Sequence, residues 1–106
     1  MLASWETDGQ VFYTRIDPAT GKHSDPVAAP GTAKGRKHSI AVANDKGETV
    51  LVWTEGIGWN HGGSLSWQVF DKEGKPTAEK GHADGVPTWS LVAVFARADG
   101  GFTIVY

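Results

Sequence analysis

The chain repeats a series of strand-like segments. Residues 2–6 (LASWE) precede residues 11–17 (VFYTRID) and, about fifty residues later, residues 51–55 (LVWTE) precede residues 65–71 (LSWQVFD). Residues 102–106 (FTIVY) begin the series again. Repeats of this length, made only of strands, indicate the four-stranded antiparallel blades of a β-propeller. One blade cannot bury its apolar face alone, and the chain holds about two, so we expect self-association to complete the fold.

The repeat also assigns the strands to blades, within one domain that covers residues 1–106. We expect a partial blade at 1–37, a complete blade at 38–80 and a second partial blade at 81–106. Small side chains favour residues 38–43 and 91–96 as the innermost strands, nearest the propeller axis. The second strands are predicted at 2–6, 49–54 and 102–106, and the third strands at 11–17 and 65–71. The outermost strands are predicted at 23–27 and 76–80.

Composition narrows the class of protein. Aromatic residues make up 10% and hydrophobic residues 40% of the 106 residues, which is enough for a packed core. A net charge of -2 gives no general attraction to nucleic acid or to an anionic membrane, and no apolar segment is long enough to span a bilayer. The chain has no cysteine, which excludes disulfides and thiolate chemistry. The basic run at 34–37 is interpreted as a solvated loop.

One loop carries the strongest candidate ligand site. In a propeller, the loops between second and third strands share a face with the loops that lead into the next blade. Residues 55–63 form such a loop, in which glycines surround Trp59, Asn60 and His61. A flat apolar ring beside polar donors and acceptors is suited to sugar binding. The structural alternative is that Trp59 folds down to cap the blade.

Further residues on this predicted face complete the candidate ligand-binding set. They are Glu55, Arg36, His38 and Trp89, and the alternative for Trp89 is packing between blades. The equivalent carboxylates Glu6 and Glu55 could in principle support acid–base chemistry. Three histidines on the face could ligate a metal together with Asp84, but their spacing follows no known metal signature; they are His38, His61 and His82. We therefore predict no catalytic residue, no metal and no cofactor. Residues kept by both repeats are predicted to be blade core: Trp5, Trp53, Tyr13 and Trp67.

Residues 39–47, 50–55 and 63–74 resemble the sialidase-like, or BNR-repeat, β-propellers of bacteria. The family's Asp-box reads S-x-D-x-G-x-T-W. Here residues 17–21 and 71–75 keep the Asp and the Gly but lack the Ser, the Thr and the Trp. The resemblance implies a secreted or periplasmic protein, although the sequence shows no signal peptide. Catalytic members hold three arginines around a carboxylate, and the three arginines of this chain do not match those positions.

Three functions are compatible with these residues. The first is a non-enzymatic carbohydrate-binding or interaction module, in which several shallow sites on one ring act together. The second is a fragment of a sialidase-like glycoside hydrolase whose catalytic residues lie elsewhere. The third is a self-assembling propeller fragment without a ligand. The expected partners are further copies of the chain and glycans, with no nucleic acid and no membrane.

Overall fold

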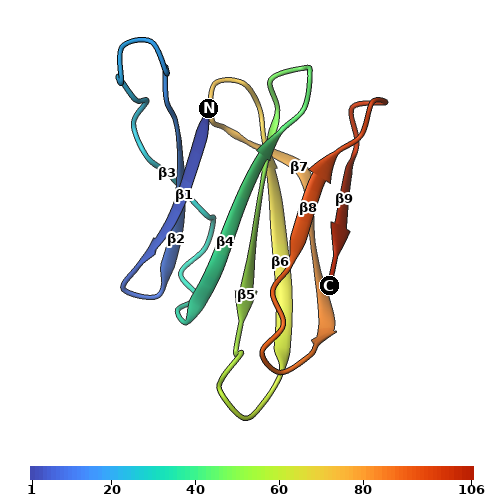
Figure 1. Ribbon diagram of the computed structural model, residues 1–106. Coiled ribbons are helices and arrows are strands. Elements are labelled where there is room, and N and C mark those ends of the chain that lie inside the picture. Colours follow the sequence, from blue (N-terminus) through green and yellow to red (C-terminus); the bar gives the residue numbers. More distant parts are fainter.

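The computed structural model describes residues 1–106 as three small antiparallel β-sheets without a helix. The first sheet has the order β1-β2-β3, the second β4-β5-β6-β7 and the third β8-β9, and the three lie side by side (Figure 1). The predicted all-β class is therefore confirmed. No helix capable of crossing a membrane is found. The strands are β1 Leu2–Thr7, β2 Gln10–Arg15, β3 Val27–Ala28, β4 Arg36–Ala43, β5 Thr49–Glu55, β6 Gly63–Phe70, β7 Pro76–Val86, β8 Ala93–Ala96 and β9 Phe102–Val105.

Within each sheet, every strand bonds to its neighbour in sequence, and most of these pairs are joined by short polar turns. In the turn between β4 and β5, the Asn44 side chain accepts hydrogen bonds from the backbone N–H groups of Lys46 and Glu48. Gly47 follows with φ +80°, a conformation that is strained for residues with a Cβ. Asp71 and Gly74, with φ +81°, repeat this arrangement between β6 and β7. Both turns lie between strands that the sequence predicts, at 38–43 and 49–54 and at 65–71 and 76–80.

The outermost strands differ from prediction. The strand expected at 23–27 is reduced to β3, with a single bridge joining Ile16 to His23. The strand expected at 76–80 is β7, which continues to Val86 because β6 offers partners along its whole length, as far as Gly63. Residues 81–86, which lie outside every strand predicted from the sequence, are therefore part of β7. A regular ladder satisfies backbone groups that a loop would have to leave to water.

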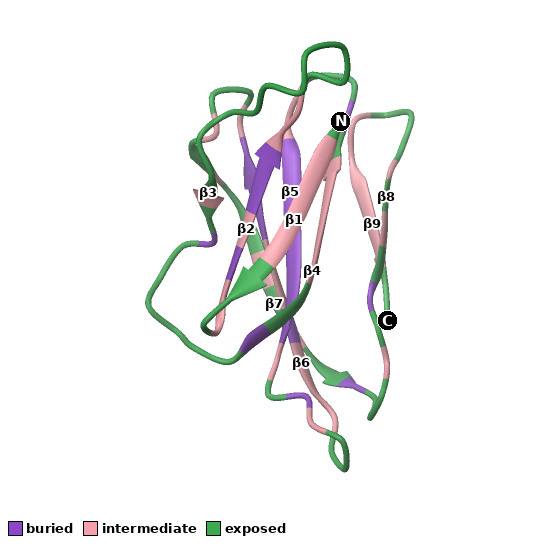
Figure 2. Cartoon of the chain, turned by 60° about the vertical axis from the view of Figure 1, so that its left-hand side comes forward, coloured by how far each residue is buried: buried purple, intermediate pink, exposed green.

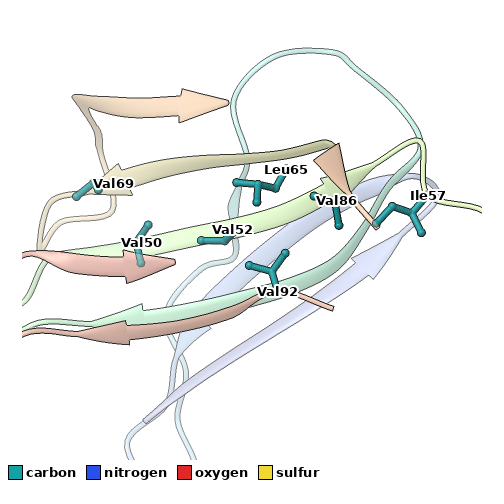
Figure 3. Packing of buried hydrophobic residues seen from close by; sticks show 7 residues of the cluster. All are labelled: Val50, Val52, Ile57, Leu65, Val69, Val86 and Val92. Atoms are coloured by element: carbon teal, nitrogen blue, oxygen red, sulfur yellow. The ribbon is translucent and has the colours of Figure 1, made fainter. Parts of the chain in front are cut away.

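The central strand β5 is buried on both faces (Figure 2). Leu51 and Trp53 belong to a cluster with Val11 and Tyr13 of the first sheet. Because side chains alternate along a strand, Val50 and Val52 point the opposite way. They join a second cluster of Ile57, Leu65, Val69, Val86 and Val92 (Figure 3), against which residues of the third sheet pack. Each of the two spaces between sheets therefore has its own apolar core.

Polar contacts also join the first sheet to the second. The Arg15 guanidinium donates to the Gly47 carbonyl oxygen and, at 2.8 Å, to the Thr49 hydroxyl. Arg36 is buried, so the prediction that the basic run is a solvated loop is wrong for this residue. Its backbone belongs to β4, where it pairs with Glu55. Neighbouring residues Lys34 and Lys37 are exposed, as a solvated loop would have them.

Candidate functional site

A groove of about 340 Å³ brings together three residues of the predicted ligand-binding set, His38, Trp59 and Trp89. It lies between the loop after β5 and the segment that joins β7 to β8. Trp59 is 73% exposed and Trp89 is 74% exposed, although both have large hydrophobic side chains. Neither tryptophan is therefore used mainly as core, which was the structural alternative for each. The remaining lining residues are Lys37, Ile57, Gly58, Ser90 and Leu91.

Close backbone approaches hold the two walls of the groove next to each other. A Cβ on Gly62 would overlap the carbonyl oxygen of Val86, the last residue of β7. A Cβ on Gly63 would overlap the carbonyl oxygen of Glu55. Gly62 therefore lets the loop that carries Trp59 reach the segment that carries Trp89, and Gly63 lets the two ends of that loop approach each other. At the loop tip, the Gly58 N–H donates to the His61 carbonyl oxygen at 3.1 Å, and this bond closes a tight turn.

Two groove residues adopt left-handed backbone conformations that side chains rarely tolerate. His38 has φ +53° and Trp89 has φ +63°. His38 lies at a bulge between β4 and β5, where its N–H donates to the Glu6 carboxylate at 2.8 Å and its Nδ1 lies 3.1 Å from the Thr54 hydroxyl. Such conformations cost about 1–3 kcal/mol and occur preferentially at binding and catalytic sites. The groove contains two of the three non-glycine residues with positive φ, the third being Asp8.

The other four predicted site residues lie outside the groove. Arg36 donates to the Gln10 side chain at 2.8 Å and to the carbonyl oxygens of Ala29 and Pro30, and its guanidinium carbon lies 5.0 Å from the centre of the Trp53 ring. Glu55 accepts a 2.7 Å hydrogen bond from the Trp53 indole and lies 3.8 Å from Arg36. Both side chains therefore take part in a network between the first two sheets. Asn60 and His61 are exposed at the loop tip.

Sequence reasoning missed the part of the groove beyond Trp89. It placed the next strand at 91–96, but β8 begins only at Ala93. A hydrogen bond from the Ser90 N–H to the Pro87 carbonyl oxygen forms a turn, which keeps Ser90 and Leu91 in the groove wall. Pro87 is a turn signal, and it could have extended the predicted loop by two residues.

A hydrogen-bonded Ser–His–Asp chain also lies outside the predicted set. The Ser66 hydroxyl is 3.0 Å from His82 Nδ1, and His82 Nε2 is 3.1 Å from an Asp84 carboxylate oxygen. Register brings them together, since Ser66 pairs with His82 on the next strand and Asp84 follows two residues later. All three are on the outer half of the second sheet, where Asp84 is almost fully exposed. Water competes for these bonds and salt screens the charge, so we assign them no catalytic role.

The three histidines of the metal-binding alternative do not lie together in the structure. His38 lies in β4, His61 at the loop tip and His82 in β7, and no three metal-binding side chains are grouped in the structure.

The observed architecture is that of an all-β protein with three stacked antiparallel sheets and a tryptophan-lined groove at one end. No family model, curated protein or solved structure matches the chain. The resemblance to sialidase-like propellers accordingly stays a prediction from the residues.

Proposed function

We propose that the chain is a carbohydrate-binding module built of propeller blades, with its ligand in the groove between Trp59 and Trp89. The observation that supports this most directly is the exposure of two indoles on the walls of one groove. Indole rings pack well against the apolar C–H faces of sugars. An ammonium group at Lys37, an imidazole at His38 and a hydroxyl at Ser90 are available there to hydrogen-bond sugar hydroxyls.

The size of the groove and its backbone strain agree with this function. A volume of 340 Å³ is at the lower end of the range for small-molecule sites, which is about 300–1,000 Å³, and it suits a short saccharide. Two residues held in costly conformations at one groove favour a selected site over an incidental hollow. This favours the binding module over a structural fragment without ligand.

The hydrolase alternative has less support. Its signature would be arginines that converge on one carboxylate. Instead, Arg15 binds the turn before β5, Arg36 is buried between sheets, and Arg97 pairs with Asp99 in the β8–β9 turn at 3.2 Å. Turnover of a fluorogenic sialoside by the purified chain would nevertheless overturn the binding-only proposal.

A glycan array followed by titration calorimetry on the best glycan tests the proposal. Trp59→Ala and Trp89→Ala should each weaken binding at least tenfold, which corresponds to about 1.4 kcal/mol. Tyr106→Ala is the matched control, since it removes an exposed aromatic ring that is not part of the groove. The double variant Trp59→Ala, His61→Ala should bind no more weakly than Trp59→Ala alone, because His61 does not line the groove. A blank array, or equal losses in the groove variants and the control, would contradict the assignment.

A further inference from the structure

The chain makes the same kind of sheet–sheet contact twice. We call the face that a sheet turns towards the next sheet in sequence its leading face, and the opposite face its trailing face. The leading face of the first sheet, with Val11 and Tyr13, packs on the trailing face of the second, with Leu51 and Trp53. The leading face of the second sheet, with Val50 and Val52, packs in turn on the trailing face of the third.

On the first sheet, no other sheet packs on the trailing face. Ser4 donates to the Ser39 carbonyl oxygen and Glu6 accepts from the His38 N–H, so both point towards β4 in the second sheet. Because side chains alternate along a strand, Trp5 between them points away, on the trailing face. There Trp5 pairs across the strands with Phe12, and the two rings stack with their centres 5.6 Å apart.

On the third sheet, no other sheet packs on the leading face. Val94, Phe102 and Ile104 pack towards the second sheet, which leaves the alternate residues on the leading face. This face carries Phe95, which is 53% exposed, and Val105, which is 55% exposed. In an isolated chain these side chains meet water, which is unfavourable for apolar groups of this size.

The two unused faces correspond by repeat to faces that already pack together. Trp5 is the repeat equivalent of Trp53, which is buried on a trailing face. Counted from the equivalent turn glycines Gly100 and Gly47, Val105 corresponds to Val52, which is buried on a leading face. We propose that a second copy of the chain covers both, so that the trailing face of each first sheet packs on the leading face of the partner's third sheet.

We propose that two copies close the assembly. Three sheets from each of two copies make a ring of six sheets, four of which have fewer than four strands, and six is within the range of about four to eight blades in known propellers. Both junctions are then identical, and no leading or trailing face stays open. The chain alone exposes 6196 Å², compared with about 5,700 Å² for a compact monomer of its mass. This excess is in the direction expected of a subunit with uncovered faces.

Assembly would also affect the affinity of the protein for glycans. A pair would present two grooves, so a multivalent glycan would be held more tightly than a single sugar. This consequence rests on the carbohydrate assignment, whereas the assembly itself does not.

Size-exclusion chromatography with light scattering tests the pairing directly. The wild-type chain should elute at twice its 11.3 kDa mass. Trp5→Lys and Phe95→Glu should each give monomers, because each buries a charge against an apolar face at both junctions. An equimolar mixture of the two variants should recover the dimer. One junction then keeps Trp5 against Phe95, and the other places the new lysine against the new glutamate.

Each possible outcome decides the question. A wild-type monomer at every concentration, single variants that remain dimers, or a mixture that stays monomeric would overturn the proposal. Ala19→Lys, in an exposed turn away from both faces, should keep the wild-type mass. Circular dichroism serves as the control that each variant is folded. Glycan affinity per site should be unchanged in Phe95→Glu, so failure of assembly and failure of the groove assignment are distinguishable.

Discussion

Arg36 is the residue whose environment departs most from its type. Its guanidinium is buried between the first and second sheets, with three oxygen acceptors, a carboxylate at 3.8 Å and an indole ring at 5.0 Å. A buried charge is tolerated only when its partners are in place, because removal of the charge leaves them desolvated and unpaired. Removing the Arg36 side chain would therefore leave the oxygen atoms around it buried without the hydrogen bonds and the charge that it supplies.

Arg36→Ala should lower the free energy of unfolding by about 3 kcal/mol. The Pro30 carbonyl oxygen would lose its donor, the Ala29 carbonyl oxygen would keep only the Gln10 amide, and Glu55 would lose a nearby cation. Urea denaturation measures the change, with Lys34→Ala as the exposed control that should stay within about 0.5 kcal/mol of the wild type. Equal stabilities of the two variants would show that the network contributes nothing.

The sequence could not have predicted this environment. Arg36 lies in a glycine-containing basic run, which has the composition of a solvated loop. Its burial depends on contacts with Gln10, Ala29 and Pro30, which come from the first sheet and the loop that follows it. In contrast, Trp59 and Trp89 could be predicted as candidate site residues, because an aromatic side chain in a glycine-rich or proline-bounded loop is informative by itself. His38 could be predicted as a candidate from its place at the start of a strand on the same predicted face.

Individual strands could be predicted where their own residues demand burial. β5 and β6 are apolar, rich in β-branched or aromatic residues, and bounded by turn signals, and both were located to within two residues. β7 has little apolar content, so its second half read as a loop. The register of β6 extends it, and that information lies in another element.

The loop between β5 and β6 depends on a backbone contact that substitution can test. Gly62→Ala should weaken glycan binding at least tenfold, although it removes no side chain that lines the groove. The new Cβ would collide with the Val86 carbonyl oxygen and separate the walls that carry Trp59 and Trp89. Calorimetric titration with the glycan measures the loss, and Ser64→Ala is the neighbouring control. Unchanged affinity in Gly62→Ala would mean that the two walls act independently.

The whole molecule is a row of three sheets whose middle member alone is covered on both sides. The sequence could predict the row, since its segments repeat in order, and the three observed sheets follow that order. The number of sheets in a closed ring is not encoded in any one repeat. It depends on the angle between neighbouring sheets and on how many copies meet, so closure stays a proposal.

Thermal stability should depend on protein concentration if pairs form. Dissociation accompanies unfolding of a dimer, so the wild-type midpoint temperature should rise with each tenfold increase in concentration. The midpoint of Phe95→Glu should stay constant, because its monomers unfold without dissociating. Scanning calorimetry at several concentrations measures both. A wild-type midpoint that does not move would argue against association.

The pairing of every strand with its sequence neighbour has a consequence for how the protein forms. Apart from the longer segment 16–26 between β2 and β3, each ladder needs only a short connection to close, which carries a small entropic penalty. A sheet can therefore zip together while the rest of the polypeptide is still being synthesised. The slow step would then be the docking of preformed sheets. In a newly made chain, the apolar faces of the two outer sheets would be the last to be buried.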